Sequence, residues 1–222
     1  MAQKELGVKK VVIFDWDIHV GDGTANVFYD DPSVLYISIH RFDLGKFYPG
    51  PAGKHERIGE GAGRGYNVHF PFNVQPSQKD LIGDRDYIYA CEQVFFPIIK
   101  EFNPDLMIIS AGFDSALGDP LGGIGVTPTG YAYMTQGLRN LCKKTAVVLE
   151  GGYDLEALEK SSEAVIRTLM INPNDKDKFD ELLVELSGVE GTSQTQLETA
   201  AQINVRPSFK QVACNVAKVL KK

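Results

Sequence analysis

Four runs of consecutive apolar residues divide the first two thirds of the chain. They cover residues 11–17, 34–40, 105–112 and 146–152 and are rich in valine, isoleucine and leucine. Continuous apolar character is typical of strands that are covered on both faces, as in a parallel sheet. The pattern therefore predicts four buried, parallel strands.

Helix-compatible stretches alternate with or follow these runs, at 78–102, 129–144 and 161–170. Alternating strands and helices are typical of a doubly wound α/β architecture. Residues 171–178 are polar and indicate a boundary, after which 180–186 and 209–220 have the spacing of amphipathic helices, joined by a polar link. We expect one main domain over residues 1–172 and a helical extension over 173–222 that packs on it.

Residues 41–64 are rich in glycine and have no sustained periodicity, which predicts a long loop of the kind that often carries function. Its aromatic residues are Phe42, Phe47 and Tyr48. The first predicted strand begins close to the start of the sequence and ends in a polar cluster. Such a strand normally has neighbours on both sides, so we expect further strands of the sheet upstream.

Composition narrows the function classes. The 222 residues are 43% hydrophobic and 23% charged, without an apolar run long enough for a bilayer and without a secretory signal, so we expect no membrane partner and a location inside the cell. Three dispersed cysteines exclude a disulfide framework. A net charge of −6 without a long basic run argues against direct nucleic-acid binding and suits a basic peptide partner.

The end of the first predicted strand carries a candidate metal site. Asp15, Asp17 and His19 alternate with apolar residues, and alternate side chains of a strand share one face. Two carboxylates and an imidazole on one face are unfavourable unless a cation or hydrogen-bond donors neutralise them. A divalent metal would do so.

Asp114 follows the third predicted strand and reaches the same edge of the sheet. Two carboxylates and one histidine leave a coordination position open, as in a catalytic zinc site. The residue types alone leave a second interpretation open, in which these side chains cap helices or pair with arginine. For Asp114, which lies in a turn beside serine, a purely local turn role is also open.

The fourth predicted strand ends in Gly151, Gly152 and Tyr153. The glycines free the backbone, and a tyrosine hydroxyl at this edge would donate to a developing oxyanion beside a metal. The alternative is an ordinary turn from strand to helix with a packed aromatic ring.

The chain contains four ordered motifs, DWDIHVGDGT, ISIHRFDLGKFYPG, SAGFDSALGDPLGG and LEGGYD. Together they resemble the histone deacetylase family, and the LEGGY form resembles its class II branch. The resemblance covers about residues 8–170. It implies the three-layer arginase/deacetylase fold, with residues 1–172 as the carboxyl-terminal part of a catalytic domain that lacks its amino-terminal strands.

The resemblance also assigns roles at the metal site. It implies that Asp17, His19 and Asp114 bind zinc and that Tyr153 polarises the carbonyl of acetyl-lysine during amide hydrolysis. Asp15 then becomes a potassium ligand instead of a zinc ligand.

Further roles implied by the resemblance concern potassium and the substrate. Ser38 matches a second potassium ligand, while Tyr48 and Leu121 match residues of the acyl-lysine tunnel. Gly152 matches a glycine that lets the backbone approach the substrate closely. The implied partners are acetylated histone or other protein peptides and corepressor-type proteins or a second copy of the chain, in the nucleus and/or cytoplasm.

Two departures from the family pattern bear on activity. The family's tandem histidine pair, which activates the attacking water, has no match here, because the four histidines are His19, His40, His55 and His69. Val20 stands where the family usually has another histidine, so a hydrogen bond made there would be lost. General bases contribute about 10² to 10⁴ fold, so we expect weak turnover from the chain alone.

Three functions therefore stay open at this stage. The first is zinc-dependent protein deacetylation, and the second is a catalytically silent scaffold that binds acyl-lysine. The third is hydrolysis of acetylpolyamines or other small amides.

Overall fold

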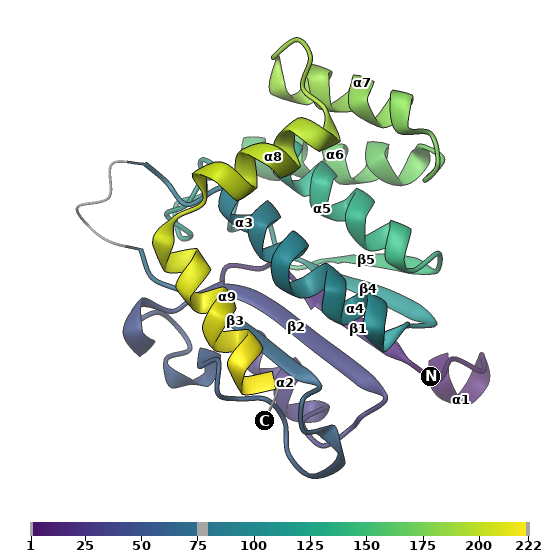
Figure 1. The fold of residues 1–222 in the computed structure, drawn as a ribbon, viewed down its shortest axis with the longest axis vertical. Coiled ribbons are helices and arrows are strands. Elements are labelled where there is room, and N and C mark those ends of the chain that lie inside the picture. The colour runs from purple at the N-terminus through teal and green to yellow at the C-terminus, as the bar shows by residue number, and fades with distance from the viewer. Residues whose placement is uncertain (1, 75–79, 221–222) are drawn as a thin grey trace.

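Five parallel strands form one sheet in the computed structural model, which describes residues 2–74 and 80–220 (Figure 1). The strands are β1 (Val11–Asp15), β2 (Val34–Arg41), β3 (Asn67–Phe72), β4 (Leu106–Ala111) and β5 (Thr145–Leu149). Their order is β3-β2-β1-β4-β5, so the chain builds outward from β1 in one direction and then in the other. The predicted doubly wound α/β architecture is confirmed, with its switch point between β1 and β4.

Nine α-helices surround this sheet in the described part of the chain. They are α1 (Ala2–Glu5), α2 (Asp22–Val27), α3 (Asp84–Ala90), α4 (Phe96–Phe102), α5 (Pro128–Leu141), α6 (Leu155–Met170), α7 (Lys176–Ser187), α8 (Gln194–Asn204) and α9 (Pro207–Leu220). A π-helical turn at Cys91–Phe95 joins α3 to α4. No helix among the described residues is long and apolar enough to cross a membrane.

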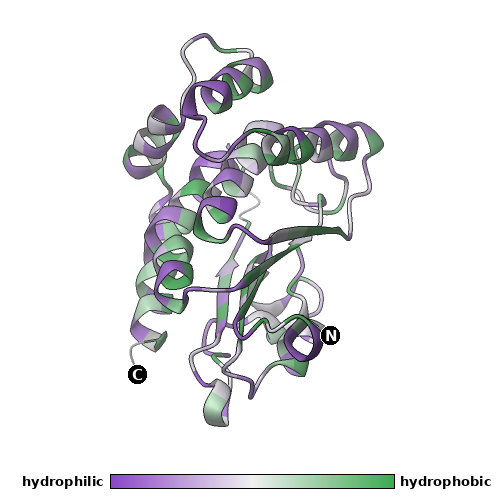
Figure 2. Cartoon of the chain, turned by 90° about the vertical axis from the view of Figure 1, so that its right-hand side faces the viewer, coloured by the Kyte–Doolittle hydropathy of each residue, from purple (hydrophilic) through white to green (hydrophobic). Residues whose placement is uncertain are grey.

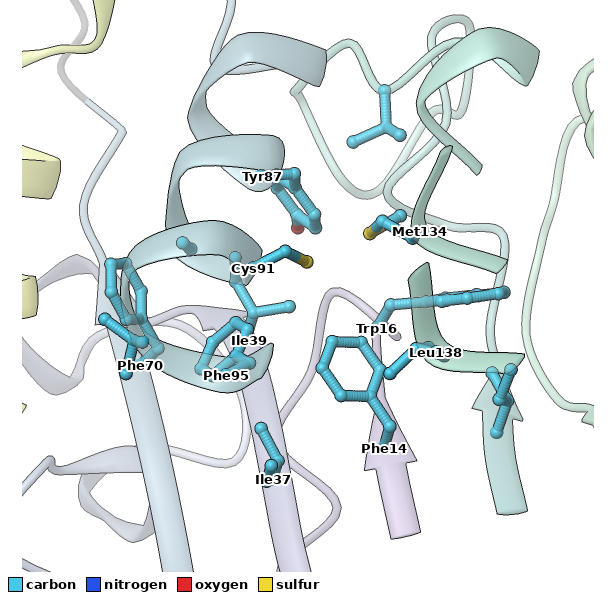
Figure 3. Close-up of a cluster of buried hydrophobic side chains, with 14 of the residues drawn as sticks. Phe14, Trp16, Ile37, Ile39, Phe70, Tyr87, Cys91, Phe95, Met134 and Leu138 are labelled. Atoms are coloured by element: carbon cyan, nitrogen blue, oxygen red, sulfur yellow. The ribbon is translucent and has the colours of Figure 1, made fainter. Parts of the chain in front are cut away.

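The main core lies between one face of the sheet and α3, α4, α5 and α9. Aromatic rings fill much of it, with Phe14 packed edge-on against Phe95 at 5.4 Å and Trp16 against Tyr131 at 5.5 Å. Figure 3 shows part of this core, with the labelled side chains Phe14, Trp16, Ile37, Ile39, Phe70, Tyr87, Cys91, Phe95, Met134 and Leu138. Burial of these large side chains fixes β1 beneath the helices and so fixes the residues that follow β1.

The opposite face of the sheet is covered by α1 and α2. Ile13, Val34 and Tyr36 pack there against Ala25 of α2. Apolar strands between helices with one hydrophilic face give the distribution seen in Figure 2. The result is the three-layer arrangement that the sequence predicts.

Several element predictions need correction. Strand β3 was not predicted, because Pro71 and two polar residues interrupt its apolar pattern, and α8 was expected to be a polar link. The helix expected from residue 78 begins at Asp84, and residues 78 and 79 lie outside the described residues. Strand β5 is largely exposed instead of covered on both faces, because it is the edge of the sheet in the described structure.

The carboxyl-terminal helices pack on the rest of the molecule. Phe209 of α9 lies 5.4 Å from Phe70 and 5.5 Å from Phe72, both of β3. Phe179 of α7 is buried against Ala132 of α5 and Ala164 of α6. Helix α9 therefore completes the main core, and α7 covers a smaller one.

Candidate metal centre

The candidate metal ligands meet at the carboxyl edge of the sheet. Asp17 and His19 follow β1, and Asp114 follows β4, the neighbouring strand. The switch point of a doubly wound sheet opens a crevice at this place, where ligands of such folds usually bind. Chain topology therefore brings together residues that are far apart in the sequence.

One ligand atom from each residue lies within 4.8 Å of the others. His19 Nδ1 is 3.1 Å from Asp17 Oδ1 and 3.0 Å from Asp114 Oδ2. The main chain holds the carboxylates in place, since the N–H of His19 donates to Asp17 Oδ1 at 2.8 Å and the N–H of Ile18 donates to Asp114 Oδ1 at 2.8 Å. The second oxygen of each carboxylate, Oδ2, takes no part in these main-chain hydrogen bonds.

The electrostatics of the triad favour positive charge at its centre. Hydrogen bonding to Asp114 and then to Asp17 raises the pKa of His19 from 6.5 to about 9. Burial raises the pKa of the Asp114 carboxyl above its ordinary value, because the charged form is removed from water. Oxygen and nitrogen donors on a half-buried, anionic site suit a divalent cation such as zinc.

Two glycines let the backbone approach this position closely. A Cβ on Gly112 would lie 2.0 Å from Asp17 Oδ2, which no side chain tolerates. A Cβ on Gly151 would lie 3.1 Å from Asp17 Oδ2, 3.2 Å from Asp114 Oδ2 and 3.3 Å from the hydroxyl oxygen of Tyr153. The tyrosine hydroxyl and two carboxylate oxygens therefore surround one point above Gly151.

The Tyr153 side chain is 57% exposed and stands at the open side of the triad. Partial desolvation and then the nearby carboxylates of Asp114 and Asp17 raise the pKa of its hydroxyl, so the hydroxyl stays protonated and can donate. Gly152 has a φ of +134°, a conformation that favours glycine, and turns the chain toward the site. This geometry suits a donor to an oxyanion.

Asp119 is a site residue that sequence reasoning did not select. It is buried, and its carboxylate accepts the main-chain N–H of Tyr153 at 2.8 Å and that of Leu121 at 2.8 Å. The sequence signal was weak, because an aspartate between glycine and proline is ordinary turn chemistry. The hydrogen bond that brings Asp119 into the site comes from Tyr153, 34 residues later in the sequence.

Aromatic residues of the 41–64 loop lie against the triad. The Phe47 ring stacks on the His19 imidazole at 5.1 Å, and Tyr48 meets the same imidazole edge-on at 6.0 Å. The Arg41 guanidinium lies 4.5 Å from the centre of the Phe47 ring. Tyr48 is 76% exposed and Leu121 is 49% exposed, so both residues of the expected tunnel lie at the surface near the site.

Asp15 and Ser38 lie beside the triad but outside it. They are register partners on β1 and β2, and both are buried. Asp15 accepts a hydrogen bond from the Tyr36 hydroxyl at 2.7 Å and one from the N–H of Asp17 at 3.1 Å. Burial raises the pKa of the Asp15 carboxyl well above its ordinary value.

The remaining histidines lie outside the triad. His40 is buried, with Nδ1 2.8 Å from the Ser38 hydroxyl and Nε2 2.8 Å from the carbonyl of Gly53. His69 is buried beside it, 5.7 Å away ring to ring, and His55 pairs with Glu56 at 3.4 Å. His19 is the histidine that the fold brings to the triad.

Comparison with known proteins gives consistent matches. Residues 1–169 match a family model described as the histone deacetylase domain. Histone deacetylase HDA1 of Candida albicans is 48% identical over 168 residues, which are 75% of this chain and 20% of that protein. Histone deacetylase 15 of Arabidopsis thaliana is 50% identical over 171 residues, 77% of this chain and 30% of that protein.

Solved structures match over more of the chain. The structure of the histone deacetylase Clr3 superposes with a TM-score of 0.79 at 39% identity and covers 99% of this chain and 33% of that one. The HDA15 HD domain gives a TM-score of 0.76 at 40% identity, with 97% and 52% covered. The chain therefore spans a third or less of the length of the two full relatives whose sequences it matches.

Proposed function

The chain belongs to the histone deacetylase family, and from that membership we propose that its triad binds zinc for the hydrolysis of acetyl-lysine in histones or other proteins. The observation that carries the proposal is the convergence of Asp17, His19 and Asp114 with the Tyr153 hydroxyl around one point. Two carboxylates and one imidazole would hold the ion and leave a position for water and the acetyl oxygen. Zinc, when bound, supplies Lewis acidity to that oxygen and acidity to the water.

The residues of this chain would bind and orient the substrate. The Tyr153 hydroxyl donates a hydrogen bond to the acetyl oxygen, where negative charge develops as the amide carbon becomes tetrahedral. Tyr48 and Leu121 cover the aliphatic stem of the lysine and exclude water from it. The glycine backbone at Gly152 gives the acyl group room beside Tyr153.

A second cation would brace the zinc site. Asp15 and Ser38 are register partners on the neighbouring strands β1 and β2, and both are buried. We propose that these two residues bind potassium. Support comes from the donor set and from the raised pKa of the Asp15 carboxyl, which is the pKa of a carboxyl buried without sufficient positive charge nearby. A cation at this place would hold the turn that carries Asp17.

Zinc binding and hydrolysis are tested together with Asp114→Asn. The amide oxygen keeps the hydrogen bond from Ile18 N–H, but an amide nitrogen replaces the Oδ2 that faces His19. We expect zinc affinity, measured by calorimetry, to fall by roughly 100-fold or more, and any zinc-dependent cleavage of a fluorogenic acetyl-lysine peptide to disappear. Asp175→Asn, which changes a helix cap far from the site, is the matched control and should retain both.

Failure of the parent chain to bind zinc would overturn the proposal. Zinc binding without cleavage would instead favour a second candidate, a scaffold that binds acyl-lysine without turning it over. The positions of His40, His55 and His69 favour this candidate, since none of these imidazoles belongs to the triad. Zinc-dependent binding of a trifluoroacetyl-lysine peptide, followed by calorimetry, distinguishes a scaffold from an inactive fold.

A further inference from the structure

We propose that Asp119 is a positioning residue that orients Tyr153 relative to the triad and to Leu121, a residue of the expected substrate tunnel. The proposal rests on the function proposed above and assigns to the buried Asp119 carboxylate a role of its own. One carboxylate oxygen fixes the Tyr153 segment and the other fixes the 121–122 turn, so a single side chain couples the two.

The contacts of Asp119 divide between its two oxygens. Oδ2 accepts the N–H of Tyr153 at 2.8 Å. Oδ1 accepts the N–H of Leu121 at 2.8 Å and that of Gly122 at 3.1 Å. All three donors are main-chain groups, so the carboxylate acts on backbone positions and not on exchangeable side-chain rotamers.

The segments joined by Asp119 are themselves fixed to the triad. A Cβ on Gly122 would lie 1.9 Å from the carbonyl oxygen of Asp114, so the 121–122 turn rests directly on the backbone of a proposed zinc ligand. The N–H of Phe113 donates to the carbonyl of Gly151 at 2.8 Å, which holds the Tyr153 segment from its other side. The carboxylate of Asp119 joins these two segments directly, because it accepts hydrogen bonds from both.

The 41–64 loop joins the same assembly through Arg41. Its Nη1 donates to the carbonyl of Gly122 at 3.0 Å, while its guanidinium lies over the Phe47 ring that stacks on His19. Asp43 accepts a hydrogen bond from Arg41 Nε at 2.7 Å, which holds the guanidinium in place. Arg41 thus links the 41–64 loop to the 121–122 turn, and Asp119 links that turn to the Tyr153 segment.

A carboxylate is required here for a chemical reason. An aspartate offers acceptors on both sides, whereas asparagine offers one acceptor and one donor. In Asp119→Asn the amide oxygen would take the two donors Leu121 and Gly122, and the NH₂ group would face the N–H of Tyr153. Two donors in contact leave the Tyr153 N–H unbound, while the volume and shape of the side chain hardly change.

The test uses the full chain loaded with zinc, with 3-fluorotyrosine at position 153 and Asp119→Asn as the variant. Amide exchange of residue 153 should accelerate at least about 10-fold, because its N–H loses its acceptor. The fluorine resonance of residue 153 should broaden and lose most of the shift that zinc causes in the parent. Zinc affinity should be unchanged, because the hydrogen bonds of Asp119 go to main-chain N–H groups and not to the side chains of the three ligands.

Two further variants complete the design. Asp119→Ser keeps one short acceptor and is measured in parallel, so that a folding defect of either variant leaves the test intact. Asp175→Asn, a cap residue on α7, is the control and should alter neither exchange at 153 nor the fluorine signal. Protection of the β1 and β4 amides reports that the fold is retained.

Turnover adds an independent readout. If the parent cleaves an acetyl-lysine peptide, Asp119→Asn should lower kcat roughly 10- to 100-fold with little change in KM, and should lower it no further in a Tyr153→Phe background. A purely structural role would lower activity in both backgrounds. Unchanged exchange and fluorine signals in the variants would overturn the proposal, whether or not the parent is active, so its failure is separate from a failure of deacetylation.

Discussion

Single atoms decide whether the triad can exist. The close approach of Gly112 to Asp17 and of Gly151 to the same carboxylate leaves no room for even one methyl group at the first position. These glycines belong to motifs that the sequence displays, but their necessity follows from distances that no periodicity reports. Composition at the strand ends predicted which residues meet, and packing determines how closely they meet.

Gly112→Ala should therefore abolish tight zinc binding without unfolding the protein. The added Cβ would push the Asp17 carboxylate out of the triad, and we expect the zinc dissociation constant to rise at least about 10- to 100-fold. Gly23→Ala is the matched control, because a Cβ at Gly23 meets no atom within 4 Å. Calorimetric titration of both variants checks the prediction, and equal affinities would contradict it.

The buried histidines should contribute a loss of stability on mild acidification, whereas the raised pKa values of the buried Asp15 and Asp84 carboxyls contribute in the opposite direction. Burial lowers the pKa of His40 from 6.5 to about 4 and lowers the pKa of His69 well below its ordinary value. Below about pH 6.5 these imidazoles take up protons in the unfolded chain but not in the folded one, so their contribution to the free energy of unfolding falls as pH falls toward 4. The expected loss for His40 is about 3 kcal/mol over this range.

Urea unfolding at a fixed potassium concentration, repeated between neutral and acidic pH, measures this dependence. His69→Leu should reduce the slope, because His69 contributes to it and its ring nitrogens make no hydrogen bond among the described residues. His55→Gln is the control, since His55 is only partly buried and should leave the slope unchanged. Equal slopes in the parent and in His69→Leu would count against a buried neutral imidazole at position 69.

Elements differ in how clearly the sequence marks them. Strands β1, β2 and β4 were predicted because each is a continuous apolar run between helices, and α5 and α9 because their apolar residues repeat at helical spacing. Strand β3 escaped because its buried positions include Asn67, His69 and Pro71, which are uncommon in strand interiors. Its polar residues lie on the same face as Asp15 and Ser38, so burial in a polar layer overrides propensity there.

Helix α9 should contribute strongly to stability through one ring. Phe209 is fully buried and packs against Phe70 and Phe72 of β3. Phe209→Ala should lower the free energy of unfolding by about 3–5 kcal/mol, because the lost ring leaves a cavity over β3. Ile203→Ala, at a position of α8 that is 70% exposed, should cost far less in the same denaturation measurement.

At the scale of the whole molecule, one edge of the sheet stands out. Strand β5 pairs with β4 on one side and has no strand on its other side among the described residues. Val148 is 49% exposed and Leu149 61% exposed on this strand. An apolar strand with free main-chain donors and acceptors is a template for pairing with another strand, unless charge or cover blocks it.

This edge predicts association of the chain with itself as concentration rises. Val148→Lys places a charge on the apolar edge and should shift sedimentation or light scattering toward the monomer, since pairing would then bury an ammonium group. Ile203→Lys adds the same charge at a residue of α8 that is 70% exposed, outside β5, and should leave association unchanged. Equal effects of the two lysines would assign association to net charge, and a parent that stays monomeric at high concentration would show that the edge is protected.

Because β5 runs directly into Glu150 and the Tyr153 segment, pairing at this edge would also restrain the site. The fluorine signal of 3-fluorotyrosine at position 153 should therefore change with the same concentration dependence.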